Sequence, residues 1–248
     1  MRLSGSRSAS PIAREGIPFI LGAAALAVVL TGLLSRWGGL PATVPLTIGA
    51  GLVGFTAFFF RDPAPREDAP PHVALAPAQG RVADITEVEH PYMGGRCRRI
   101  GIFLSIFDVH VQRAPWPGVV EDRGYRKGRF FAAWSPEASN ENEQAELCLR
   151  GEAGPFVVRQ IAGLVARRIV TDPEVGDRVA RGGRIGLIRF GSRVELLMPL
   201  DWTVLCAVGD RVRVGRSAVA RCAGYLGEAE TGSDADVTRT RNGPEAEG

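Results

Sequence analysis

Lysine, histidine and cysteine are scarce in this sequence, and each shortage narrows the chemistry that the chain can perform. Lys127 is the only lysine among 30 basic residues, and it lies in the polar segment 124–128, so an imine-forming lysine would have to stand on a solvated turn. The four cysteines include no Cys-x-x-Cys pair and have no histidine at ligand spacing, so we expect no metal site. Unpaired cysteines of this kind are typical of a reducing, cytoplasmic setting.

Acidic residues are concentrated at the C-terminal end, which leaves the rest of the chain basic. Residues 228–248 carry six acids against two arginines, so residues 1–227 have a net charge of +7 although the whole chain has only +3. A basic body suits an anionic membrane surface or a phosphate-bearing ligand. Nucleic acid is not expected as a partner, because the arginines are scattered through apolar segments instead of being clustered with exposed aromatic residues.

Two long runs without a charged side chain, residues 17–35 and 40–60, predict a transmembrane helical hairpin over residues 17–60. At about 1.5 Å per residue, each run is close to the roughly 30 Å of a bilayer's hydrocarbon core. A secretory signal is the alternative for the first run, but its apolar region would be only about 7–15 residues long. Five arginines flank the hairpin against Arg36 between the runs, so both ends are expected on the cytoplasmic side of the cell membrane.

Outside the hairpin, the chain divides into a polar arm (1–16), a proline-rich linker (61–79), a β-rich domain (80–227) and an acidic tail (228–248). The tail is too polar to be buried, so we expect it to be disordered. Residues 136–145 indicate a short helix or an acidic loop. Alternating apolar residues between turn signals predict strands over residues 82–88, 98–106, 109–112, 118–122, 129–134, 147–150, 156–162 and 166–170.

An internal repeat points to a particular β architecture. Val-Gly-Asp-Arg-Val at residues 175–179 returns at residues 208–212, 33 residues later. A Gly-Asp turn followed by a strand is typical of the hairpins in flattened barrel-sandwich domains related to biotinyl and lipoyl domains. We therefore expect a mainly β soluble domain of this kind. A carrier function is excluded, because a biotinyl or lipoyl carrier needs a lysine at its hairpin tip and neither tip has one.

The segment 183–199 predicts two β-strands that meet at Gly191 and Ser192, because its apolar side chains recur at every second residue. A glycine inside such a pattern marks a β-bulge or a close approach of another group to the backbone. One interpretation is a bulge with a solvated serine. The other is that Ser192 attacks the carbonyl that precedes it and breaks the chain there. A serine hydrolase is not indicated, because Gly-x-Ser-x-Gly is absent around Ser192.

This segment also carries a family resemblance. Gly-Leu-Ile-Arg-Phe-Gly-Ser-Arg-Val at residues 186–194 resembles the processing site of the short, bacterial-type phosphatidylserine decarboxylases, which depend on a pyruvoyl group. Phe-Arg-Asp-Pro at 60–63, Phe-Leu-Ser-Ile-Phe-Asp-Val-His-Val-Gln-Arg-Ala-Pro at 103–115 and Gln-Ile-Ala-Gly-Leu-Val-Ala-Arg-Arg-Ile-Val at 160–170 resemble the same family. Together, these segments extend the resemblance over residues 40–205.

The resemblance implies the activity and the cofactor. It implies self-cleavage between Gly191 and Ser192, conversion of Ser192 to the pyruvoyl group that forms a Schiff base with the substrate, and association of the two products, chains 1–191 and 192–248. The expected reaction converts phosphatidylserine in an anionic membrane to phosphatidylethanolamine and CO₂. A homo-oligomer is left open. The alternative is an uncleaved, non-catalytic lipid-binding or adaptor module tethered to the membrane.

Further candidate site residues come partly from the resemblance and partly from their own chemistry. The family assigns the histidine at the position of His110 to the active site, where it would transfer protons. Asp108 lies two residues away and would orient the imidazole, although a plain cross-strand partner is an equal alternative. Arg113, Arg167 and Arg168 are candidates for binding the phosphodiester or the carboxylate of the substrate, with a structural ion pair or a solvated face as the alternative for each.

One departure from the family pattern generates a prediction. The family carries Ser-Pro-Ala-Asp-Gly where this chain has Ala-Pro-Ala-Gln-Gly at residues 76–80, and the aspartate is thought to assist self-cleavage. Because Gln79 has no useful basicity, cleavage is expected to be slow, and Gln79→Asp should speed the appearance of two chains on a denaturing gel. If its rate is unchanged while Asp108→Asn abolishes cleavage, Asp108 supplies the carboxylate instead.

Overall fold

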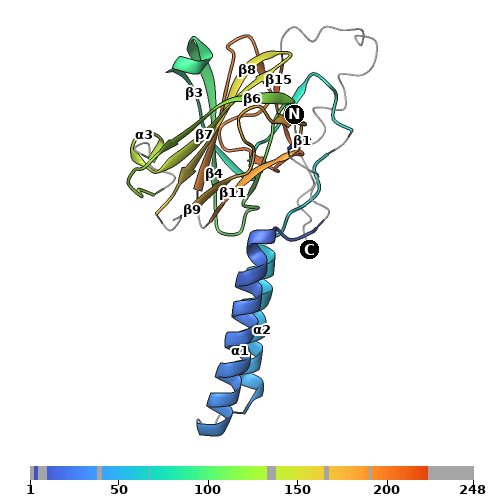
Figure 1. Cartoon of the computed structure of the whole chain (residues 1–248), viewed down its shortest axis with the longest axis vertical. Coiled ribbons are helices and arrows are strands. Elements are labelled where there is room, and N and C mark those ends of the chain that lie inside the picture. The colour runs from blue at the N-terminus through green and yellow to red at the C-terminus, as the bar shows by residue number, and fades with distance from the viewer. Residues whose placement is uncertain are drawn as a thin grey trace, which may run out of the picture.

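A pair of apolar helices projects from one end of a curled β domain, as Figure 1 shows for the computed structural model. The structure describes residues 3–4, 10–37, 41–66, 68–132, 138–164, 168–189 and 192–222. The helices are α1 (Ile17–Trp37), preceded by the short 3₁₀ helix Arg14–Gly16, and α2 (Thr43–Phe59). Two helices were predicted here, and their positions are confirmed.

The helices pack on each other and expose apolar side chains to the outside. Gly49 permits the close approach, because a Cβ atom there would lie 2.4 Å from the Cβ of Ala27. Val28 and Ile48 are about 70% exposed on the outer faces. The segment Arg14–Arg36 is long and apolar enough to cross a bilayer, whereas α2 is equally apolar but has 17 residues.

The domain is built on a nine-stranded sheet that curls into a half-barrel (Figure 1). Its strands, in sheet order, are β1 (Leu3–Ser4), β10 (Arg178–Val179), β6 (Gly118–Arg126), β7 (Gln144–Gly151), β8 (Gly154–Ala162), β12 (Ser192–Met198), β4 (Gly95–Leu104), β3 (Gly80–His90) and β14 (Arg211–Val212). The first pair, β1 and β10, is parallel and the other pairs are antiparallel.

Two smaller sheets and two short helical segments complete the domain. The smaller sheets are β5 (Val111–Arg113), β11 (Arg184–Arg189) and β9 (Arg168–Thr171), and β13 (Thr203–Val204), β15 (Ala218–Arg221) and β2 (Val73–Leu75). The helical segments are α3 (Ala138–Glu141) and the 3₁₀ helix Pro91–Met93. The main core includes Ile100, Leu104, Val158, Leu196 and Trp202, all buried. The inward side chains of β4, β8 and β12 supply much of it.

The sequence repeat is a structural repeat as well. Gly176 and Gly209 both have positive φ angles, and their N–H groups donate to Val120 and Val82 on the strands at each flank of the sheet. The side chain of each following aspartate accepts a hydrogen bond from the main-chain N–H three residues earlier. The fold is therefore mainly β with a repeated turn-and-strand unit, as predicted, and the two units close opposite ends of the large sheet.

Some predicted elements differ from the structure. The strand expected over residues 129–134 is wrong for its described part, because Arg129 makes only an isolated bridge to Asn142. The linker expected over residues 61–79 contains β2, which pairs with β15. Residues 136–145 contain both α3 and the start of β7. The tail over residues 228–248 lies outside the described residues.

A buried ion pair joins the segment after α2 to the β domain. Arg113 and Asp62 are both fully buried and form a hydrogen-bonded salt bridge. Arg113 also donates to the carbonyl oxygens of Gly182, at 2.8 Å, and Pro63, at 3.1 Å. A small apolar cluster that includes Phe59, Phe60, Val111 and Leu187 packs beside it. The helices are therefore held against the domain by apolar packing and by the buried salt bridge.

Removing the charge of Asp62 from this salt bridge should destabilise the folded protein. In Asp62→Asn the Arg113 guanidinium would stay buried without its counter-charge, which costs roughly 3 kcal/mol or more. Chemical denaturation in detergent should show this loss. Asp68→Asn is the control, because its salt bridge with Arg66 is exposed to solvent, and it should leave the midpoint unchanged. Equal midpoints for the two variants would contradict a structural role of the buried pair.

Candidate active site

Ser192 begins β12 in the middle of the large sheet. It pairs with Leu104 of β4 on one side and with Ala162 of β8 on the other, so its side chain lies on the core face of the sheet. The residue is fully buried, and its Oγ has no hydrogen-bond partner among the described residues. An unpaired buried hydroxyl costs free energy, so such a group calls for a functional explanation. Gly191 lies outside the described residues.

His110 is fully buried, and its hydrogen bonds determine which ring nitrogen carries the proton. Its Nδ1 lies 2.9 Å from the main-chain carbonyl oxygen of Asp108, which can only accept, so Nδ1 carries the hydrogen. In the neutral ring Nε2 then presents a lone pair, and this atom has no partner among the described residues. The ring of Phe59 packs against the imidazole with the centroids 4.1 Å apart.

Burial keeps this imidazole neutral. It lowers the pKa of His110 from 6.5 to about 4, and the positive charge of Arg61 contributes in the same direction. At neutral pH the side chain is therefore a proton acceptor at Nε2.

Two connections bring His110 to the end of the sheet that holds Ser192. Leu104, the partner of Ser192 in β4, is followed by the turn 105–108 that leads to His110. From the other side, the N–H of Ile188 in β11 donates to the His110 carbonyl oxygen at 3.3 Å. Ile188 precedes Ser192 by only four residues, which limits their Cα separation to about 14 Å. The sequence-predicted pair is thus gathered at one end of β11 and β12.

Asp108 orients His110 through its main chain. Its carboxylate accepts hydrogen bonds from the N–H and the hydroxyl of Ser105, at 2.8 and 2.7 Å, and so closes the turn before the histidine. The orienting contact expected from the side chain comes instead from the carbonyl oxygen.

A chain of buried amides supports the histidine from the other direction. Gln112 donates to the His110 carbonyl oxygen at 2.7 Å and accepts from Gln160 at 2.8 Å. Gln160 in turn accepts from the hydroxyl of Thr171 at 2.9 Å. Sequence reasoning missed these residues, although two glutamines inside otherwise apolar strands were a usable signal. The amides connect β5, β8 and β9 around the site.

Arg193 occupies the opposite face of the sheet, because successive side chains of a strand alternate. It is almost fully buried, donates to Glu195 at 2.8 Å and forms a salt bridge with Asp84. Gly101 makes room for it, since a Cβ atom there would lie 2.1 Å from the guanidinium. Asp84 is therefore engaged by Arg193, and also by Arg99 at 3.2 Å.

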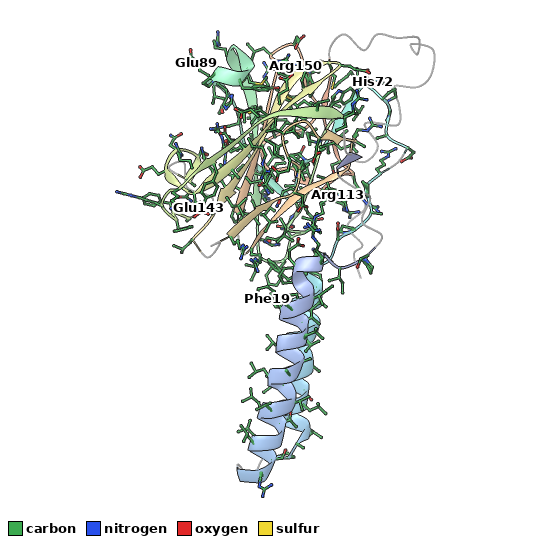
Figure 2. The ribbon with its side chains drawn as sticks, viewed as in Figure 1. Phe19, His72, Glu89, Arg113, Glu143 and Arg150 are labelled. Carbon is green, nitrogen blue, oxygen red and sulfur yellow. The ribbon has the colours of Figure 1, made fainter. Side chains whose placement is uncertain are left out.

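The three predicted substrate arginines have separate positions. Arg113 is enclosed in its ion pair with Asp62, which is the structural alternative that the sequence left open. Arg168 is exposed at the start of β9, directly opposite Arg189 of β11. Arg167 lies outside the described residues. Sequence reasoning missed Arg189, whose guanidinium lies 5.0 Å from the ring centroid of Phe19 in α1. Figure 2 shows Phe19 where α1 meets the domain.

The described residues contain no group of three or more His, Cys, Asp or Glu side chains arranged to hold a metal ion. The chemical groups at this site are a hydroxyl, an imidazole and amides.

Comparison with known proteins assigns the chain to a family. The family model for phosphatidylserine decarboxylase matches residues 52–220. The phosphatidylserine decarboxylase proenzyme of Symbiobacterium thermophilum is 47% identical over 215 residues, which cover 85% of this chain and 95% of that protein. The proenzymes of Geobacter sp. strain M21 and Citrifermentans bemidjiense are 44% and 43% identical over 211 residues, 85% of this chain and 96% of each relative.

The neutral, buried imidazole predicts a pH dependence of stability. Between pH 6.5 and about 4, the unfolded chain binds a proton at His110 that the folded protein excludes, so stability falls as the pH falls through this window. Over the same pH range, the free energy of unfolding of His110→Gln should fall by roughly 3 kcal/mol less than that of the unmodified protein, as measured by denaturant unfolding. If the two proteins lose stability in parallel, His110 is not held neutral by burial.

Proposed function

This chain belongs to the phosphatidylserine decarboxylase family, and from that premise we propose that Ser192 and His110 form the centre of its active site. The protein is a lyase of phospholipid biosynthesis that converts phosphatidylserine to phosphatidylethanolamine and CO₂, and it is made as a proenzyme. The observation that carries the assignment of the site is the pair of unpartnered polar atoms, Ser192 Oγ and His110 Nε2, buried at the same end of β12.

Maturation begins with an attack by Ser192 on the carbonyl carbon of Gly191. His110 Nε2 accepts the hydroxyl proton, Oγ forms an ester as the peptide C–N bond breaks, and the released nitrogen takes up a proton. Elimination then removes the Cα proton of residue 192 and breaks its Cβ–Oγ bond, which leaves Oγ in the new carboxylate at the end of chain 1–191. Water hydrolyses the remaining enamine at position 192, and ammonia is released. Water is the one added reactant, and its oxygen becomes the new carbonyl oxygen.

The product of this sequence is a pyruvoyl group at position 192, which supplies an electron-accepting carbonyl for loss of CO₂ from the substrate. The site fits such a group, because the space around Oγ is enclosed and contains no competing hydrogen-bond partner among the described residues. In each turnover, His110 Nε2 would accept a proton from the substrate's ammonium group and return it to the substrate carbon after CO₂ has left. Asp108 and Gln112 hold the ring in position through main-chain hydrogen bonds.

Arg168 is the candidate among the described residues for binding the substrate's phosphodiester or carboxylate, and Arg167 is its neighbour in sequence. Arg113 is not part of this set, because its guanidinium is already paired with Asp62 and two carbonyl oxygens.

The two product chains stay associated because β12 remains between β4 and β8 after the break. Main-chain pairing extends from Ser192 to Met198 with β4, and from Ser192 to Leu197 with β8. The ion pairs of Arg193 with Asp84 and Glu195 hold the first residues of β12 in the same place.

The domain organisation and location in this proposal are those predicted from the sequence. Residues 17–60 form a membrane-spanning helical hairpin, and residues 80–227 form the catalytic domain on the cytoplasmic side of the cell membrane, as the apolar runs and the flanking arginines support. The arm (1–16), the linker (61–79), which contains β2, and the acidic tail (228–248) complete the proposed division. The repeated units at residues 175–182 and 208–215 are the hairpins of a flattened barrel-sandwich related to biotinyl and lipoyl domains, which their matching turns support.

An uncleaved lipid-binding module is the second candidate, and one observation favours it. Gln79 replaces the aspartate that assists cleavage in relatives. Both candidates bind lipid, but only the enzyme is cut.

Intact-mass measurement of the purified protein separates the two functions. The enzyme should appear as a chain of 191 residues and a chain containing the remaining 57 of its 248 residues, with a blocked N-terminus. Ser192→Ala removes the attacking oxygen, so it should remain one chain and release no CO₂ from phosphatidylserine. Two chains from Ser192→Ala would rule out self-cleavage by this serine, and one chain from the unmodified protein would favour the lipid-binding module.

A further inference from the structure

The ends of α1 and α2 nearest the β domain enclose an apolar groove of about 270 Å³. The only polar side chain in its wall is that of Thr56, whose hydroxyl is already bonded to the Leu52 carbonyl oxygen at 2.8 Å. The groove therefore offers methyl, methylene and aromatic surface and no free polar group. Its walls include Phe19, Gly22, Leu26, Leu52, Phe55 and Phe59.

The groove adjoins the proposed active site across the ring of Phe59. Phe59 forms part of its wall and also packs against the imidazole of His110, with the ring centroids 4.1 Å apart. Phe19 forms the opposite wall and stacks on Phe60. A ligand in the groove would therefore be separated from His110 by a single aromatic ring.

A pair of cations stands at the rim of the groove. Arg189 lies over Phe19, and Arg168 lies directly opposite Arg189 across β11 and β9. Like charges directly opposite in a sheet repel each other. Burial lowers the pKa of Arg189 and the charge of Arg168 lowers it further, while the charge of Glu15 acts in the opposite direction. No acidic residue in the described part of the chain forms a salt bridge with either arginine, so both guanidinium groups are open to an anionic ligand.

We propose that the groove binds one acyl chain of the substrate phospholipid and that Arg189 and Arg168 bind its phosphodiester. The inference rests on the proposed function and extends it to the place where the lipid is held. An acyl chain is the occupant that matches the groove, because the helices expose apolar side chains suited to a bilayer and the rim carries positive charge. The phosphate at the rim then directs the serine headgroup past Phe59, toward His110 and Ser192.

Two glycines of α1 allow this site to be tested with a matched control. Gly22 lines the groove, and Gly32 lies on the same helix away from it. A Cβ atom added at either position would meet nothing within 4 Å, so neither backbone site is closed to a side chain. Gly22→Phe fills the groove, whereas Gly32→Phe adds the same ring to the lipid-facing surface.

Photo-cross-linking measures lipid binding without requiring turnover. Phosphatidylserine with a photoreactive group in one acyl chain, incorporated in phosphatidylcholine vesicles, should label the peptides around Phe19–Leu26 and Leu52–Phe60 more strongly than the rest of the helices. The stronger labelling of these peptides should disappear in Gly22→Phe and persist in Gly32→Phe. Diacylglycerol with the same chain should label the groove less, because it lacks the phosphate. Even labelling along both helices, or equal behaviour of the two variants, would overturn the proposal.

Steady-state kinetics gives an independent measurement. Gly22→Phe should raise KM for phosphatidylserine in mixed micelles about tenfold, the equivalent of losing roughly two buried methylene groups, with kcat unchanged. Gly32→Phe should keep both parameters. If the protein cleaves and decarboxylates but the two variants have the same KM, the acyl site is wrong and the enzyme assignment stands. If it labels in the groove but never cleaves, the lipid site stands and the enzyme assignment falls.

Discussion

The pairing of β12 between β4 and β8 is the constraint on which the rest of the site depends. It places Ser192 inside the domain with its hydroxyl on the core face, where water cannot satisfy it. The same pairing turns Arg193 to the other face, among Asp84 and Glu195. A strand held on both sides can lose the covalent bond before its first residue and still keep its position, since the hydrogen bonds that locate it lie beyond the break.

Burial also explains how one histidine serves this chemistry. A solvated imidazole would be partly protonated near neutral pH, whereas the enclosed ring of His110 has a pKa of about 4. The carbonyl of Asp108 selects the tautomer with a free lone pair at Nε2. Phe59 supplies part of the enclosure, so a residue of the apolar helix α2 contributes to the protonation state of His110.

The charged residues near the site fall into two groups with different consequences. Arg113 and Arg193 are buried with acids and hold elements together, and removing either partner would leave an uncompensated charge. Arg168 and Arg189 face each other without an acid in a salt bridge among the described residues, and they lie where the helices meet the domain. Their positive charge is available to an anionic lipid. Both kinds of arginine occur in the same apolar strand segments, so sequence context alone does not separate them.

The sequence by itself determined the apolar helices, the β class of the domain and the turn-and-strand repeat, and it indicated Ser192 and His110 as candidate site residues. These features depend on local hydrophobic periodicity, on run length and on short motifs, all of which are readable along the chain. Only the tertiary structure decided that Arg113 pairs with Asp62, 51 residues away, and that the Asp108 main chain orients His110. It also decided that Gln112 meets Gln160 and that Arg189 meets Phe19. Except for the contact of Asp108 with His110, which depends on the turn before the histidine, these contacts join residues remote in sequence. Their partners are selected by strand register and by the docking of the helices, which no local pattern encodes.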